Sequence, residues 1–297
     1  MSANKAPGLS FGVAMMALLA GAMGMAISPV FVRLAEVGPF ASAFWRVLLA
    51  LPVLWLWAAI ETKRAGQPHA VMWKLTPVLF LCGLFFAGDL FFWHLAILNT
   101  TIANATFLAT MAPVWVVLGS GFFIAEPVSR QTIAGLLVCI AGAAILIGFS
   151  YSFSPGHVAG DLYGLATSFF FGAYFLAVRA ARRKSSGGQV VFASSLVTAA
   201  ILFIIALALE PGLLPVSASG VFALLALGIV SHAGGQGLLA VALGSLSAAF
   251  SSLVIFIEAV AAAGFAWGLL GEALTLQQAA GGGLILAGIW IARPRQA

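Results

Sequence analysis

The apolar stretch CGLFFAGDLFFWHLAIL, residues 82–98, contains an acid and an imidazole, Asp89 and His94. The pair could relay a proton, bind a solute or form a satisfied polar contact. Five residues correspond to about 140° around an α-helix, so Asp89 and His94 do not share a face, and a direct relay within one helix is not expected. Asp89 shares its face with Trp93. We expect Asp89 at a helix interface or in a cavity, and His94 nearer the helix end, close to Asn104.

A second group of polar residues interrupts the apolar sequence farther along the chain. His232 and Gln236 are four residues apart and therefore lie on one face of a helix. Glu258 falls near the middle of the next apolar run, and the tight turn LGSLS predicts that the two runs pack as antiparallel neighbours. His232 and Glu258 could form an interhelical hydrogen bond, or they could line a cavity and bind an amine or exchange a proton. Both alternatives remain open at this point.

These polar residues stand out because the rest of the chain is apolar. Of its 297 residues, 63% are hydrophobic and 7% are charged, whereas soluble domains carry about 25% charged residues. The composition therefore indicates an integral membrane protein, with length for roughly ten spans of about 20 residues. The two cysteines lie within apolar runs and indicate neither a disulfide framework nor a metal site. No metal or other cofactor is expected.

Ten apolar runs predict an all-α fold of ten transmembrane helices. They cover residues 10–33, 39–60, 74–98, 102–124, 130–149, 161–182, 189–209, 219–243, 247–269 and 276–292. Cytoplasmic termini place all of the 13 Lys and Arg residues except Arg33 and Arg46 on the inner side. The positive-inside rule thus predicts a multi-pass protein of the inner (plasma) membrane with both termini in the cytoplasm. The net charge of +5 reflects this orientation, so no nucleic-acid partner is expected.

The second half of the chain resembles the first at a shift of 146 residues. EPVSRQTIAGLLVCIAGAAI (126–145) and EALTLQQAAGGGLILAGIWI (272–291) match at seven of twenty positions without a gap. Each repeat, 1–150 and 151–297, holds five spans, so the second enters the membrane from the opposite side. Inverted-topology repeats are typical of secondary transporters, whose solute site lies near the midplane between the repeats.

Polar and small residues of the repeat predict structural roles. Glu126 and Glu272 precede helix starts, TLQQ fits a capping box with Thr275 as N-cap, and Ser129 can cap in the first half. Glycines in the last span of each repeat permit close helix approach. We expect these glycines to bring helices together inside one chain. We also expect the protein to function as a monomer.

The chain resembles the drug/metabolite transporter superfamily in its ten-helix form, which is built from two EamA-type repeats. The resemblance lies in SPVFVRLAEVGPFASAFWRVLLALP (28–52), in LAILNTTIANATFLATMAPVWVVLGSGFFIAEPVS (95–129) and in the second-half counterpart ending LLGEALTLQQAAGGGLILAGIWI. It implies export of small metabolites, often amino acids, through a central cavity between the halves; amino-acid exporters of the YddG type are one branch. Arg46 falls on the family's arginine of the second helix. Ala259 stands opposite Pro113, where the family often has a second proline, so a helix break there is not simply carried over.

The expected function is export of amino acids or related small molecules across the bilayer by alternating access. The candidate substrate-binding residues are Asp89, Tyr174, His232, Gln236 and Glu258, and the candidate gate or outer-cavity residues are Arg46, His94 and Asn104. Tyr174 is the aromatic residue best placed to face a cavity. Arg46 could instead snorkel to the outer interface, which is the more common role near helix ends.

Two other classes of function compete with transport. FAGD (86–89) and VAGD (158–161) come one glycine short of the GxGD pattern of intramembrane aspartyl proteases. Asp161, however, falls at a span end, where two catalytic carboxylates could not meet at the midplane, and the sequence has no HExxH, GxSxG or P-loop motif. No catalytic residue and no enzyme activity are therefore expected. A non-transporting scaffold predicts no solute flux.

Overall fold

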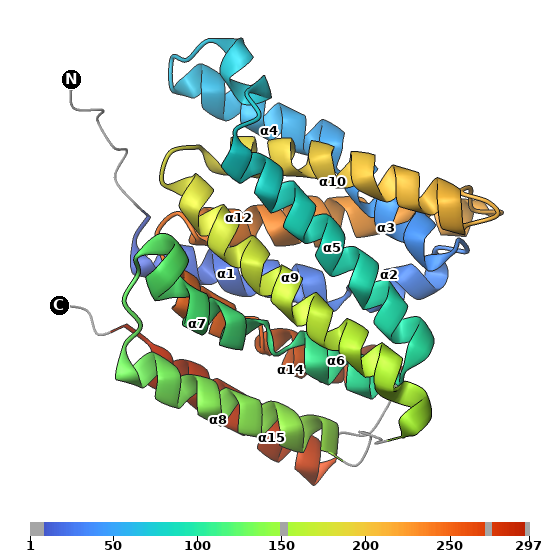
Figure 1. Ribbon diagram of the computed structural model, residues 1–297, viewed down its shortest axis with the longest axis vertical. Coiled ribbons are helices and arrows are strands. Elements are labelled where there is room, and N and C mark those ends of the chain that lie inside the picture. Colours follow the sequence, from blue (N-terminus) through green and yellow to red (C-terminus); the bar gives the residue numbers. More distant parts are fainter. Residues whose placement is uncertain (1–8, 149–153, 271–274, 295–297) are drawn as a thin grey trace.

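The computed structural model describes residues 9–148, 154–270 and 275–294, and every regular element in these ranges is helical (Figure 1). The α-helices are α1 (Phe11–Ala26), α2 (Ser28–Leu34), α3 (Pro39–Leu48), α4 (Leu51–Arg64), α5 (Pro77–Asn99), α6 (Ile102–Ala109), α7 (Ala112–Ile124), α8 (Arg130–Ile147), α9 (Val158–Arg182), α10 (Gly187–Leu209), α11 (Ala218–Ala226), α12 (Gly237–Ala242), α13 (Ala248–Val254), α14 (Ile257–Leu270) and α15 (Leu276–Ala292). Two short 3₁₀ turns, η1 (His69–Trp73) and η3 (Pro155–His157), and a π-helical stretch, η4 (Leu227–Gln236), complete the elements.

These helices combine into membrane spans. In the described part of the chain, eight helical segments are long and apolar enough to cross a bilayer, and two shorter apolar segments follow at Ala248–Ala261 and Leu276–Ala292. Together they correspond to the ten runs expected from the sequence. The protein is an all-α, multi-pass integral membrane protein, because only closed helical hydrogen bonding satisfies the backbone of such segments in lipid.

Four of the spans are interrupted by a break between two helices. The breaks separate α1 from α2, α3 from α4, α6 from α7, and α13 from α14. In the first three, a proline occupies the first turn of the second helix: Pro29, Pro52 and Pro113. Proline lacks the N–H that would continue the helix, and its ring collides with the carbonyl one turn earlier. These three breaks therefore have a local cause.

The break between α13 and α14 forms without a proline, which corrects the doubt raised by Ala259. Ile255 N donates to Ser252 O, three residues back, at 3.1 Å. Ser252 Oγ also donates to Ala249 O at 2.8 Å, in competition with the helical ladder. Three-residue bonds and serine back-bonding tighten or bend a helix, so they can produce the break that proline produces in the first half.

Glycines bring α8 and α15 together, and the two helices lie side by side at one edge of the bundle (Figure 1). A Cβ atom at Gly142 would lie 2.8 Å from Gly281 O, and one at Gly288 would lie 2.7 Å from Gly135 O. Only glycine permits backbones this close. The expectation that these glycines pack inside one chain is confirmed.

Replacement of Gly142 by leucine is expected to lower the free energy of unfolding by about 2 kcal/mol, because overpacking displaces α15. Thermal unfolding of the purified protein in detergent measures the effect. Gly283→Leu is the matched control, since a Cβ atom at Gly283 would meet no atom within 4 Å. Equal melting temperatures for the two variants would contradict the role of this contact.

The predicted helix caps are also present. Ser129 Oγ accepts a hydrogen bond from Thr132 N at 3.0 Å, at the start of α8. Thr275 and Gln278 form both bonds of a capping box at the start of α15. Glu272, the repeat counterpart of Glu126, lies outside the described residues.

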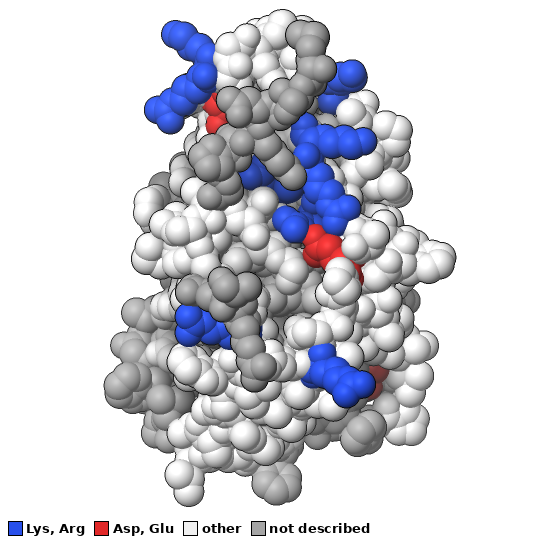
Figure 2. All heavy atoms as spheres, turned by 90° about the vertical axis from the view of Figure 1, so that its left-hand side faces the viewer, with Lys and Arg blue, Asp and Glu red and all other residues white. Residues whose placement is uncertain are grey.

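Basic side chains gather at one end of the bundle. The start of α1 and the end of α15 lie at this end, and Figure 2 shows Lys and Arg side chains spread over it. They belong to helix ends and short loops: Lys63, Arg64, Lys74, Arg130, Arg179, Arg182, Arg183, Lys184 and Arg293. Lys5 and Arg295 lie outside the described residues. The charge asymmetry thus distinguishes the two ends of the spans.

Candidate functional site

A cavity of about 170 Å³ lies where three of the interrupted spans meet. The break between α1 and α2 contributes Ser28 and Pro29, that between α6 and α7 contributes Thr110, and that between α13 and α14 contributes Ile255 and Glu258. The remaining wall is formed by Met25, Ala26, Arg46, Phe86, Asp89, Leu90, Trp93, Thr106, Ala109, Thr167, Phe171, Gln236 and Ala259. Binding sites of secondary transporters are typically formed by discontinuous helices near the middle of the membrane.

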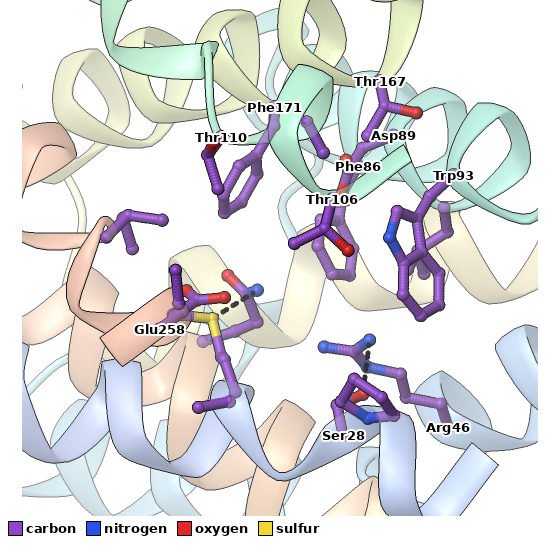
Figure 3. Close-up of a pocket in the computed structure, with 18 residues that line it drawn as sticks. Ser28, Arg46, Phe86, Asp89, Trp93, Thr106, Thr110, Thr167, Phe171 and Glu258 are labelled. Atoms are coloured by element: carbon purple, nitrogen blue, oxygen red, sulfur yellow. Dashed lines mark hydrogen bonds between the residues drawn. The ribbon is translucent and has the colours of Figure 1, made fainter. Parts of the chain in front are cut away.

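Among the described residues, three ionisable side chains line the cavity: Arg46, Asp89 and Glu258. Figure 3 shows the guanidinium of Arg46 and the carboxylate of Glu258 pointing into the cavity from opposite sides. Arg46 Nη1 donates to Ser28 Oγ at 3.3 Å, and the guanidinium carbon lies 5.9 Å from the centre of the Phe86 ring. One cation thus faces two acidic groups in a wall that is otherwise largely apolar.

The interpretation that Arg46 snorkels to the outer interface is wrong. Its side chain is buried, with 7% of the residue exposed, and so is that of Asp89, with 8% exposed. A buried guanidinium needs nearby opposite charge to offset the loss of its hydration. Two acids, Asp89 and Glu258, line the same cavity as Arg46, and neither is close to Arg46 in the sequence.

Several buried polar atoms on the cavity wall have no hydrogen-bond partner among the described residues. They are Arg46 Nε, Gln236 Oε1 and Glu258 Oε1. Buried polar groups are nearly always paired in folded proteins, so each such atom requires an explanation. The guanidinium of Arg46 can only donate hydrogen bonds. The amide oxygen of Gln236 and a carboxylate oxygen of Glu258 can only accept them. The wall therefore presents both kinds of hydrogen-bonding group.

His232 and Tyr174 lie behind the cavity wall. His232 Nε2 shares a 2.8 Å hydrogen bond with Ser195 Oγ of α10, in place of the bond to Glu258 considered from the sequence. The rings of His232 and Tyr174 pack against Phe86, with centroid distances of 5.3 and 4.9 Å. Both residues therefore support a cavity residue and do not themselves line the cavity.

The two other outer candidates contact different partners. His94 Nδ1 bonds to Leu90 O at 2.7 Å, and its ring lies 6.1 Å from that of Phe40. Asn104 Nδ2 donates to Asp161 Oδ1 at 2.9 Å, which ties α6 to α9. Neither side chain is part of the cavity wall.

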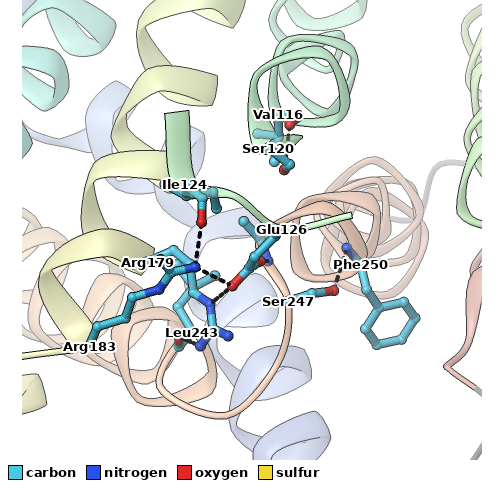
Figure 4. Close-up of polar contacts among 10 residues, drawn as sticks. Val116, Ser120, Ile124, Glu126, Arg179, Arg183, Leu243, Ser247 and Phe250 are labelled. Atoms are coloured by element: carbon cyan, nitrogen blue, oxygen red, sulfur yellow. Dashed lines mark hydrogen bonds and ion pairs between the residues drawn. The ribbon is translucent and has the colours of Figure 1, made fainter. Parts of the chain in front are cut away.

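An ionic cluster connects the two halves of the chain at the basic end (Figure 4). We refer to Glu126, Arg179 and Arg183 as the Glu126 cluster. Glu126 Oε1 accepts from Arg179 Nε at 2.5 Å and from Arg183 Nη2 at 3.2 Å, and Glu126 Oε2 accepts from Ala248 N, at the start of α13, at 3.1 Å. Arg179 Nη1 continues the network to Leu243 O at 2.7 Å. Glu126 therefore has structural contacts, and it caps α13, a helix in the second half of the chain.

The order of residues along α9 relates this cluster to the cavity. Thr167 and Phe171 line the cavity, Tyr174 and Phe175 are buried in the next turn, and Arg179 belongs to the Glu126 cluster. At 1.5 Å per residue, about 12 Å of helix separates Phe171 from Arg179. A layer of packed aromatic side chains thus lies between the cavity and the basic end.

Sequence reasoning missed the hydroxyl groups of the cavity wall. Ser28, Thr106, Thr110 and Thr167 line it, yet hydroxyl residues are common in membrane helices and carry little signal by themselves. The positions of Pro29 and Pro113 could have pointed to Ser28 and Thr110. Residues beside a helix break lie where backbone groups are free to bind a solute.

Comparisons with known proteins agree with this architecture. The sequence profile of the EamA-like transporter family matches residues 12–148 and again residues 158–293. The pseudopaline exporter CntI of Pseudomonas aeruginosa is 29% identical over 85% of this chain and 83% of its own length. The aromatic amino acid exporter YddG of Ancylobacter novellus is 32% identical over 50% of each chain. A solved crystal structure superposes with a TM-score of 0.83 over 95% of this chain and 97% of the other, at 21% identity, which supports the fold alone.

Proposed function

Because the chain belongs to the EamA-like transporter family and is a membrane transporter of small metabolites, not an enzyme, we propose that it exports amino acids or closely related zwitterions by alternating access. Membership of a transporter family excludes the intramembrane protease considered from the sequence. The pairing of Asp161 with Thr100 and Asn104, at 2.8 and 2.9 Å, gives that acid a structural role instead.

The observation that carries the proposal is the placement of Arg46 opposite Glu258 in one cavity (Figure 3). The planar fork of an arginine matches a carboxylate, and a carboxylate matches an ammonium group. Phe86 and Trp93 provide apolar wall for a side chain. A cavity of about 150 Å³ holds benzene in another protein, so the 170 Å³ cavity is large enough for a small solute.

The Glu126 cluster supports an alternating-access cycle. It closes the basic end by joining the segment after α7, in the first repeat, to α9 and α13 of the second. By the positive-inside rule, we assign the basic end to the cytoplasm and the protein to the inner membrane, with both termini cytoplasmic. The repeats 1–150 and 151–297 are then the two bodies that move about the cavity, within a single monomer.

Counterflow of labelled amino acids into liposomes that contain the purified protein tests the proposal. We expect accumulation that depends on unlabelled amino acid inside the vesicles. An applied pH gradient distinguishes proton exchange from facilitated diffusion. If no amino acid of any class is exchanged, the proposed substrate class is wrong, and the scaffold alternative gains support.

Replacement of Glu258 by glutamine is expected to raise the KM of amino-acid counterflow about tenfold, since a hydrogen bond to a charged group contributes about 1.5–3 kcal/mol. His232→Ala is the matched comparison, because His232 bonds to Ser195 behind the wall. That variant is expected to lower thermal stability while the ranking of substrates stays the same. A KM that Glu258→Gln leaves unchanged would return Glu258 to a packing role.

A further inference from the structure

We propose that Gln236 and Glu258 together form an ammonium-binding pole in the cavity, and that Gln236 selects solutes with a free amino group. This inference deepens the proposed function and rests on it for the nature of the transported solute. It assigns the two ends of the solute to opposite sides of the cavity.

The contacts of Gln236 fix the orientation of its side-chain amide. Gln236 is the last residue of η4 and is buried, with 2% of its surface exposed. Its Nε2 donates to Met25 Sδ at 3.1 Å, and its Oε1 has no partner among the described residues. A thioether sulfur only accepts hydrogen bonds, so the NH₂ group must face Met25 and the oxygen must face away from it.

The local backbone holds this orientation. η4 is π-helical, a geometry that inserts an extra residue per turn and often occurs at functional sites. Gly235 allows α1 to approach, since a Cβ atom there would lie 2.7 Å from Met25 Cγ. Met25 is thereby held against Gln236, and both residues line the cavity.

The unpaired atoms of the cavity wall include both hydrogen-bond acceptors and a donor. Glu258 Oε1, like Gln236 Oε1, is an enclosed acceptor without a donor, whereas the unpaired atom of Arg46 is a donor. An ammonium group brings three N–H donors and a positive charge, so it has enough donors for both acceptors of this cavity wall. A carboxylate can accept from Arg46 and Ser28, whose side chains already point to one another. The wall therefore has an amine pole and a carboxylate pole.

Isothermal titration of the full-length protein in detergent tests the amine pole with probes that carry no carboxylate. The probes are n-butylammonium, with three N–H donors, and n-butyltrimethylammonium, with the same charge and none. We expect the wild type to bind butylammonium at least about tenfold more tightly, because a hydrogen bond to a charged group corresponds to about tenfold or more in affinity. We expect Gln236→Leu to reduce this ratio to about twofold or less.

Ser231→Ala is the matched control. Ser231 belongs to the same π-helical stretch and its hydroxyl is buried and unpaired, but it is not part of the cavity wall. It should retain the wild-type ratio. Gln236→Met replaces Gln236→Leu if the latter does not fold, and the comparison of the two probes on the wild type needs no variant.

Equal affinity of the wild type for both probes, or a ratio that Gln236→Leu leaves intact, overturns the inference. Its failure is distinguishable from failure of the proposed function. Discrimination between the probes without amino-acid counterflow contradicts the proposed function alone. Counterflow without discrimination contradicts the amine pole alone.

Discussion

Replacement of Arg46 by glutamine is expected to lower kcat/KM for amino-acid counterflow by about 100-fold or more. The substitution removes the proposed donor for the solute carboxylate from a cavity that Asp89 and Glu258 also line. Loss of one partner from a buried ion pair costs about 3–5 kcal/mol, and each 1.4 kcal/mol corresponds to tenfold. Initial rates of counterflow in liposomes measure the effect.

Arg33→Gln is the control for this experiment. Arg33 lies in the last turn of α2 and is exposed outside the cavity, so its replacement should change transport little. Arg46→Lys should retain only part of the activity, because an ammonium group cannot form the two parallel bonds of a guanidinium. Equal rates for wild type and Arg46→Gln would remove Arg46 from the site.

Replacement of Glu126 by alanine is expected to open the basic end of the protein. The side chains of Glu126 and Arg179 are 13% and 19% exposed, so their pairing is partly shielded from water. Hydrogen bonds to charged groups contribute about 1.5–3 kcal/mol each. Allowing for partial exposure, we expect the closed state to lose about 2 kcal/mol, which corresponds to roughly a 30-fold shift in the equilibrium.

A cysteine at position 120 reports this opening. Ser120 is fully buried, and its carbonyl accepts a hydrogen bond from Glu126 N at 3.0 Å. In a background with Cys82 and Cys139 replaced by alanine, Ser120→Cys should react with a thiol reagent roughly 30-fold faster when Glu126 is alanine.

The charge-swapped pair Glu126→Arg with Arg179→Glu provides the rescue for this experiment. It should restore part of the protection of the cysteine at position 120, because the ion pair re-forms with its partners exchanged. A reaction rate that responds to neither change would exclude the Glu126 cluster as the inner closure.

Local sequence features predicted the membrane architecture well, and their physical basis explains why. Apolar runs of about 20 residues define spans because the hydrocarbon thickness sets their length. The break at Pro113 has a local cause, because the proline ring acts on its own turn of helix. Thr275 and Gln278 form a capping box within four residues of chain.

Features that depend on distant partners were not predictable in this way. The sequence around Arg46 left open whether it is a gate residue or snorkels to the interface, since its sequence neighbours do not include the acids that line the cavity with it. His232 was considered with Glu258, but Ser195, 37 residues away in sequence, takes the hydrogen bond. The position of Glu126 just before a helix start predicts a structural role, but its partners lie 53 and 122 residues away in the sequence.

The amino-acid sequence was sufficient to show that this chain is an all-α, multi-pass membrane protein, because long apolar runs and scarce charge act along the chain without regard to tertiary contacts. It also singled out Asp89, Gln236 and Glu258 as cavity candidates, because polar groups within apolar spans are rare. The fold was needed to show that these residues share one cavity with Arg46, while His94, Asn104, Tyr174 and His232 lie outside its wall. Burial and pairing depend on which helices meet, and packing between helices far apart in sequence sets those contacts.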